Sequence, residues 1–178
     1  EEHEEHSQYG QNYHIWLSVI QMQHFAKKLT DRLVLLDEIN STTYLQNHII
    51  LDQKLTALKQ TIQQSLNSSR QSIASYSNAF EHFIVENQLN QTTLVTSKHE
   101  ERLSIYKIIQ AKKSMQNAKA KCLVTTTDVP LKRIHPLTEG LKMNATRIDI
   151  MGSEFNLGAN QYFKLMNSVT SKVAQCLQ

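Results

Sequence analysis

The stretch IWLSVIQMQHFAKKLTDRLVLL, residues 15–36, is the main basis for predicting the fold of this chain. Its apolar residues follow one another at steps of one, three or four, which is the spacing of one face of an α-helix. The stretch belongs to a longer run, residues 11–129, that contains neither glycine nor proline. Because glycine and proline are the residues that most often interrupt helices, the run predicts a few long amphipathic helices.

Two polar segments interrupt the apolar pattern of this run. The first is Asn40–Thr43, whose side chains compete for backbone hydrogen bonds and therefore favour a turn. A second helix is expected from about Tyr44 to Asn87, because apolar residues recur there at steps of three and four, as in a packed helical seam. This spacing continues through residues 67–70, where a turn is the alternative to a continuous helix. The second break falls at Asn90–Thr93, where a hairpin would reverse the chain.

A third helix is predicted from Thr96 to Cys122. The pair Ser97 and Glu100 has capping-box spacing and marks its start. Residues 123–136 form the least helical part, because they are β-branched at first and contain both prolines of the chain. A last helix, Asn160–Cys176, is too short to be stable alone and must pack on the earlier helices.

These elements predict an all-α protein, an elongated antiparallel bundle of long helices with a short irregular connector and a C-terminal helix. We expect one helical-bundle domain, residues 11–178 with the connector at about 123–159, after an acidic flexible head, residues 1–10. The 178 residues are 40% hydrophobic, which suffices for one core. Four glycines and two prolines are too few for the turns of a β-sandwich or barrel.

The charge of the chain is unevenly distributed. The net charge is +3, yet four glutamates lie within the first six residues. The predicted third helix has a basic face that indicates a weak contact with a polyanion, or otherwise a plain solvated surface. Arginine is scarce and no aromatic residues interleave with the lysines, so no specific nucleic-acid binding is expected. The residues of this possible anion-binding face are Lys107, Lys112, Lys113, Lys119 and Lys121.

Four Asn-x-Ser/Thr sequons are the most specific signal in the sequence. Such sequons accept N-linked glycans in exported proteins, and two of them coincide with the predicted breaks. We therefore expect an extracellular, secreted glycoprotein whose signal peptide has been removed, and the absence of any long apolar run excludes a transmembrane segment. The candidate glycosylation sites are Asn40, Asn67, Asn90 and Asn144.

The two cysteines, Cys122 and Cys176, are either two buried thiols or one disulfide. Export favours the disulfide, which would pin the last helix to the end of the third. In the chain-entropy model, closing this loop would stabilise the fold by about 3–4 kcal/mol.

No pattern of catalytic or cofactor-binding residues is present. The sequence lacks GxGxxG, a Walker loop, HExxH and clustered CxxC, so we expect no enzyme activity, no cofactor and no metal site. The spacing of Glu81-His82 and of His99-Glu100 does not fit a helical di-iron site. Single histidines on separate helices are more often solvated than ligating.

Three functional hypotheses follow. The first is a secreted non-enzymatic helical protein that binds a partner protein or an extracellular matrix component. The second is a helical carrier or sensor of a small apolar ligand, held in a pocket of Tyr76, Phe80 and Phe83, although these residues could equally be packed core. The third is a self-assembling coiled coil, a homo-oligomer joined through the seam of residues 55–87.

Overall fold

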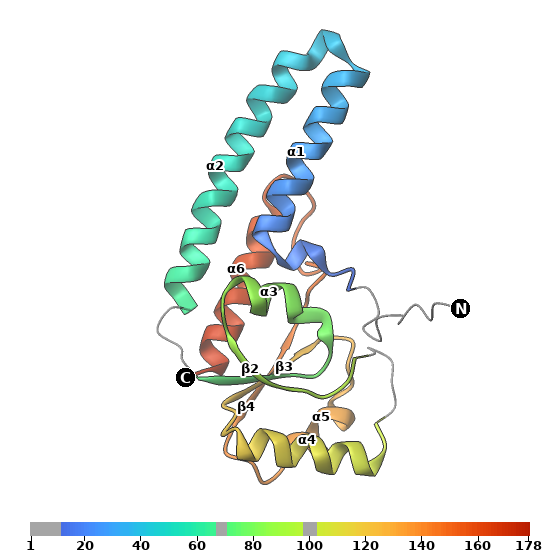
Figure 1. Ribbon diagram of the computed structural model, residues 1–178, viewed down its shortest axis with the longest axis vertical. Helices are drawn as coiled ribbons and strands as arrows, with labels where there is room; N and C mark the ends of the chain where they lie inside the picture. Colours follow the sequence, from blue (N-terminus) through green and yellow to red (C-terminus); the bar gives the residue numbers. More distant parts are fainter. Residues whose placement is uncertain (1–11, 67–70, 98–102) are drawn as a thin grey trace, which may run out of the picture.

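The computed structural model describes residues 12–66, 71–97 and 103–178. It shows a four-stranded sheet with helices on both faces and a helical hairpin that projects from it (Figure 1). The strand order is β2-β1-β3-β4, and every neighbouring pair is parallel. The strands are β1 (Ser72–Ser75), β2 (Asn90–Leu94), β3 (Cys122–Thr126) and β4 (Asn144–Ile148).

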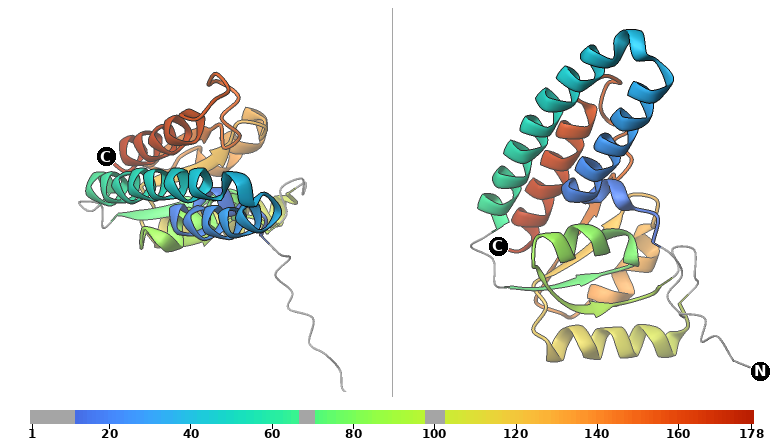
Figure 2. Two further views of the ribbon diagram at one scale, coloured as in Figure 1. Left: turned by 90° about the horizontal axis from the view of Figure 1, so that it is seen from above. Right: turned by 45° about the horizontal axis from the view of Figure 1, so that its top comes forward.

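The helices divide into the projecting hairpin and two layers on the sheet. The hairpin is α1 (Val19–Leu36) and α2 (Ser41–Leu66), and α6 (Gln161–Cys176) packs along α2 (Figure 2). On the same side of the sheet as α6 lies α3 (Glu81–Glu86); α4 (Ile105–Asn117) and α5 (Leu131–Thr138) cover the other side. The 3₁₀ turns are η1 (Ile15–Leu17), η2 (Glu38–Asn40) and η3 (Asn78–Phe80).

The all-α antiparallel bundle is therefore wrong, and the predicted helical bundle and coiled coil with it. The central strand β3, with sequence CLVTT, is buried at all five positions, and β1 is buried at all four. A strand that is covered on both faces shows no alternation of apolar and polar residues. Runs this short cannot be distinguished from buried helix by periodicity.

The predicted second helix combines two different structures. Helix α2 ends at Leu66, and the spacing that continues through Ile73 and Tyr76 belongs to strand β1 and the residue after it. A step of three residues keeps side chains on one helix face but puts them on opposite faces of a sheet. Accordingly, Ile73 packs in the core under α6, whereas Tyr76 packs in the core under α4 and α5.

The second break and the start of the third helix are also corrected. Residues 90–93 belong to strand β2 rather than to a hairpin turn. Helix α4 begins at Ile105, where the Ser104 hydroxyl accepts a hydrogen bond from the Lys107 N–H at 3.2 Å. Ser97 lies outside any helix, and Glu100 lies outside the described residues. The expected irregular connector contains β3, α5 and β4.

The helical prediction is confirmed for the hairpin. Helix α1 begins after Ser18, whose hydroxyl caps the Gln21 N–H at 3.1 Å, and the chain reverses at Asp37–Asn40, close to the predicted turn. The predicted burial of one face is not realised along its length. Several large apolar side chains of the hairpin are exposed: Phe25, Leu29, Leu35, Leu36, Ile39, Leu45, Ile49 and Ile50.

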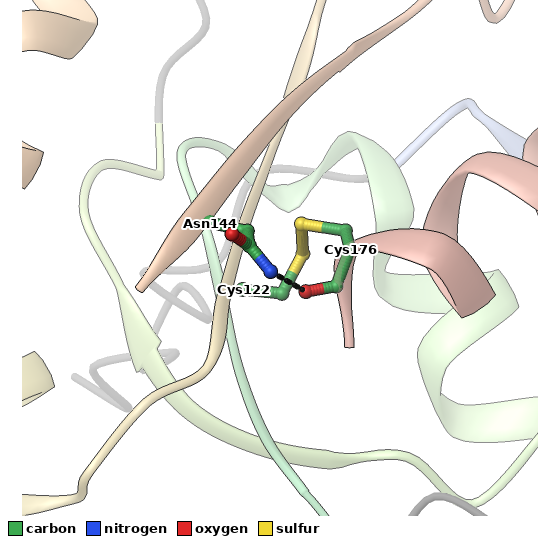
Figure 3. The surroundings of a disulfide bond; sticks show 3 residues. All are labelled: Cys122, Asn144 and Cys176. Atoms are coloured by element: carbon green, nitrogen blue, oxygen red, sulfur yellow. Dashed lines mark hydrogen bonds between the residues drawn. A yellow bond between two sulfur atoms is a disulfide. The ribbon is translucent and has the colours of Figure 1, made fainter. Parts of the chain in front are cut away.

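A disulfide joins Cys122, the first residue of β3, to Cys176, the last residue of α6 (Figure 3). Beside it, the Asn144 side-chain amide donates a hydrogen bond to the Cys176 carbonyl at 3.0 Å. Both links connect the carboxyl end of α6 to the amino edge of the sheet. The opposite, carboxyl edge carries neither of them.

The acidic head predicted at residues 1–10 lies outside the described residues, so the domain boundary stays a prediction. Across residues 12–66, 71–97 and 103–178, no helix has both the length and the apolar character needed to cross a lipid bilayer.

Candidate functional site

The carboxyl edge of the sheet is the place where the structure gathers polar side chains. In open parallel sheets, ligands bind just beyond the carboxyl ends of the strands. Here β1 is followed by Ser77 and Asn78, and β4 is followed directly by Asp149. A loop of residues 12–16, whose last two residues begin η1, lies against both strand ends and completes the candidate site.

Two long-range hydrogen bonds hold this loop in place. The Asn12 side-chain amide donates to the Asn78 carbonyl at 2.8 Å, and the Trp16 indole N–H donates to the Ile150 carbonyl at 2.8 Å. Asn78 follows β1 and Ile150 follows β4, and strand β3 lies between these two strands. The loop therefore crosses the carboxyl edge from one strand end to the other.

His14 is the metal-ligating residue type on this loop. Its Nδ1 lies 2.8 Å from Asn12 Oδ1, and its ring centroid lies 5.2 Å from that of Trp16, with the two planes tilted by 54°. The side chain is half-buried. Its imidazole is thus held by a hydrogen bond on one nitrogen and by an aromatic neighbour, the arrangement that orients histidine ligands in metal sites.

Asp149 shapes the far side of the site through hydrogen bonds to the loop that follows it. Its carboxylate accepts from the N–H groups of Met151, Gly152 and Glu154 and from the Ser153 hydroxyl, at 2.7–3.2 Å. Four donors occupy the four lone-pair positions of a carboxylate. Burial acts to raise the pKa of Asp149, but these hydrogen bonds outweigh it and hold the pKa below its ordinary value.

The loop that Asp149 folds presents the Ile150 carbonyl to Trp16. Asp149 therefore contributes a negative charge and a rigid turn to the site. Within the part of the chain that the structure describes, no group of three or more His, Cys, Asp or Glu side chains could hold a metal ion.

The three aromatic residues predicted to line a pocket do not form one. All three are fully buried, but Tyr76 packs under α4 and α5, whereas Phe80 and Phe83 pack on the α6 side of the sheet. They pack in the core on opposite faces of the sheet. An apolar groove lies elsewhere, between α1, α2 and α6, where Phe25 and Phe163 line it.

The predicted lysine face is spread over three segments. Lys107, Lys112 and Lys113 lie on α4, but the helix ends at Asn117. Lys119 follows in a turn with a positive φ of 51°, and Lys121 immediately precedes β3. The Lys112 ammonium donates to the Glu139 carbonyl at 2.8 Å and so ties α4 to the end of α5.

Three of the four sequon asparagines lie among the described residues. Asn40 and Asn144 use their side-chain amides within the fold, as donors to Asp37 and to the Cys176 carbonyl. Asn90 is exposed at the start of β2, and Asn67 lies outside the described residues. Glycosylation stays a prediction.

Sequence reasoning missed His14, its partner Asn12, and Asp149. The signal for Asp149 was its place directly after the strand NATRI, since a polar residue that follows a parallel strand lies at the carboxyl edge. For His14 the signal was Asn-x-His just ahead of the first helix. Neither signal could be recognised, because residues 144–148 were expected to be an irregular connector and no sheet edge was predicted.

Comparison with protein families gives one match over nearly the whole chain. The family model described as ZnuA, zinc-uptake complex component A, periplasmic, matches residues 1–176. A comparison with curated proteins finds no match.

Solved structures share the fold at low sequence identity. The SBP FpvC from Pseudomonas aeruginosa, in complex with Mn²⁺, is 18% identical with a TM-score of 0.79, over 93% of this chain and 62% of that one. A mutant of the laminin-binding adhesin Lmb from Streptococcus agalactiae is 14% identical with a TM-score of 0.80, over 94% and 63%. A Zn(II)-bound mutant of AdcAII from Streptococcus pneumoniae is 17% identical with a TM-score of 0.74, over 93% and 60%. The chain thus spans about three fifths of the length of the structures it matches.

Proposed function

This chain belongs to the family of zinc-uptake complex component A, periplasmic, and on that basis we propose that it binds a divalent transition-metal ion as cargo. The ion binds at the carboxyl edge of the sheet, and His14 supplies one of its nitrogen ligands. The chain hands the ion to the other components of a metal-uptake complex.

Membership of this family corrects the hypotheses drawn from the sequence. The binder of a partner protein or matrix component, the carrier of an apolar ligand and the self-assembling coiled coil are all wrong, because the match is to a component of a metal-uptake complex. The expected partners are corrected for the same reason: a matrix component, a polyanion and a second copy of the chain. The expectation of a location outside the cytoplasm is confirmed, since the family is periplasmic.

The family is one of solute-binding proteins. We further propose that this chain catalyses no reaction. A bound metal is then cargo, held by side chains that can release it, rather than a resident reaction centre.

The observation that carries the metal-binding proposal is the position and support of His14. Imidazole nitrogen suits zinc and the neighbouring divalent transition metals. The ring lies at the edge where parallel sheets bind ligands, and both Asn12 and Trp16 fix its orientation. FpvC and AdcAII, which share the fold, bind Mn²⁺ and Zn(II) according to the descriptions of their structures.

Binding by this chain alone is expected to be weak, because one histidine does not complete a tetrahedral zinc site. The described residues lack a cluster of three ligating side chains. Affinity above that of a single imidazole would need further ligands beside His14.

The test is a titration of the full chain with ZnCl₂, followed by calorimetry. A parallel titration with Co²⁺ uses the fluorescence of Trp16, the single tryptophan, as a reporter close to His14. We expect His14→Ala to weaken zinc binding by about tenfold or more and to abolish quenching by Co²⁺. His24→Ala, which removes an exposed histidine of α1, is the matched control and should change neither.

The variant His3→Ala/His6→Ala removes the histidines of the acidic head and isolates binding at the edge of the sheet. Equal zinc affinity of the His14→Ala and His24→Ala proteins in that background would refute the proposed function.

A further inference from the structure

Asn12 makes five hydrogen bonds around the candidate site. Its Oδ1 accepts from the His14 backbone N–H at 3.1 Å and lies 2.8 Å from His14 Nδ1. Its Nδ2 donates to the Asn78 carbonyl at 2.8 Å and to Glu81 Oε2 at 3.0 Å. Its own carbonyl accepts from His82 Nε2 at 3.1 Å.

Three of these bonds fix which end of the Asn12 amide faces His14. A backbone N–H is only a donor, so the atom that meets the His14 N–H must be the amide oxygen. A carbonyl and a carboxylate are only acceptors, so the atom that meets Asn78 and Glu81 must be the amide nitrogen. The orientation follows from these partners and does not depend on the protonation of the imidazole.

The orientation of Asn12 then determines the proton on His14. An amide oxygen only accepts, and it lies 2.8 Å from His14 Nδ1, so this nitrogen must carry a hydrogen. A neutral imidazole has one N–H, which leaves the lone pair on Nε2. A metal ion binds the nitrogen that has the lone pair, and the hydrogen bond on the other nitrogen selects which one that is.

We propose that Asn12 is a positioning residue that holds His14 as the Nδ1–H tautomer and so directs its Nε2 lone pair to the metal ion. The part of this inference that concerns the metal ion rests on the proposed function. The tautomer of His14 is a property of the metal-free protein. Asn12 touches no metal in this account and acts through His14 alone.

The loop keeps two other anchors when the Asn12 side chain is removed. The His82 hydrogen bond is made to the Asn12 backbone carbonyl, and Trp16 still donates to Ile150. Asn12→Ala removes the acceptor of His14 and the side-chain bonds to Asn78 and Glu81, while these two contacts persist.

The first measurement is the tautomer of His14 in the metal-free full chain, read from ring ¹⁵N shifts at about pH 8, where imidazole is neutral. We expect Nδ1–H in the wild type and in Asn12→Asp, whose carboxylate oxygen still accepts. In Asn12→Ala we expect a shift toward Nε2–H. A wild-type ring with its proton on Nε2 would overturn the inference, and so would an unchanged tautomer in Asn12→Ala.

The second measurement is the affinity for Zn²⁺ alone. Asn12→Ala should bind zinc about tenfold or more weakly than the wild type, whereas Asn117→Ala, an exposed asparagine at the end of α4, should not differ. Equal affinity of the two variants, with zinc still bound through His14, would overturn the directing role of Asn12. If the wild type binds no zinc, the proposed function fails, and the tautomer measurement still decides whether Asn12 fixes His14.

Discussion

The helical hairpin and the sheet-centred body of this protein relate differently to its sequence. In the hairpin, α1 and α2 follow the apolar spacing, yet many of their large apolar side chains are exposed; Phe25 is 51% exposed and Leu35 72%. In the body, β1 and β3 show no readable pattern, yet every residue in both strands is buried. The hairpin thus has a readable apolar spacing but many exposed apolar side chains, whereas these two strands have no readable spacing and are fully buried.

This contrast separates two causes of structure. A helix satisfies its backbone from within, so spacing and caps suffice to predict it. A parallel sheet satisfies its backbone through partners far away in sequence, as in the pairing of Ile73 with Cys122. Stability should therefore reside mainly in the body, where apolar side chains are removed from water.

The largest expected effect comes from comparing one residue type in the two regions. Phe83→Ala removes a fully buried side chain from the core of the body and should lower the free energy of unfolding by about 3–5 kcal/mol. Phe25→Ala, on the hairpin, should lower it by less than about 1 kcal/mol. Denaturation in urea measures both. Similar losses in the two variants would show that the hairpin is as tightly packed as the body.

Opening the disulfide should have the next largest effect, and it should be confined to the body. In the chain-entropy model, Cys122→Ser/Cys176→Ser loses about 3–4 kcal/mol of stability. Amide hydrogen exchange should accelerate in α6 and in β3, which the bond joins, more than in α1. Uniform acceleration across the chain would instead indicate that the hairpin and the body unfold as one unit.

Asp149 provides a test that depends on pH. Its pKa is below the ordinary value in the folded protein, so its ionised form stabilises the fold above that ordinary value, and this contribution is lost as the pH falls through the folded pKa. Asp149→Asn should cost about 1–3 kcal/mol at neutral pH and progressively less in acid.

The matched control for Asp149 is Asp31→Asn, which breaks an exposed pair with Lys27 on the hairpin. That variant should change stability by less than about 1 kcal/mol. Stability curves in urea from neutral to acid pH measure both variants. A cost of Asp149→Asn that does not diminish in acid would show that its four hydrogen bonds do not depend on the ionised form.

The smallest expected effect tests the corrected start of α4. Ser104→Ala removes the cap of the Lys107 N–H and should cost about 1 kcal/mol, as should Ser18→Ala at the start of α1. Ser97→Ala should cost less, because Ser97 lies outside any helix. A larger loss of stability in Ser97→Ala than in Ser104→Ala would support the helix start at Ser97 that the sequence suggested.

The elements that could be predicted are those whose stability is local. The spacing of Ile15 to Leu36 predicted the first helix, and the sequence also indicated α2 and α6. The sheet could not be predicted in this way, because the four residues of β1 are too few to show a period. Ile73 and Tyr76 happen to follow helical spacing while packing on opposite faces. Only knowledge of strand pairing separates these alternatives.

The candidate site was hidden for the same reason. Asn12, Asn78 and Ile150 are brought together by the order of the strands, and no motif joins them along the chain. A search for ligands at fixed spacing, such as HExxH, cannot find a site whose parts are separated by more than a hundred residues. Once the sheet is known, the polar residues after its strands and the loop that covers them are evident.

The central claim is that a metal ion binds to His14 Nε2 at the carboxyl edge of the sheet, and anomalous diffraction at the zinc edge tests it most directly. Crystals of the full chain loaded with Zn²⁺ should show an anomalous peak about 2.0–2.1 Å from His14 Nε2. Crystals of His14→Ala should lack that peak. A zinc peak on His14 Nδ1, or bound zinc only at histidines away from this edge, would contradict the account.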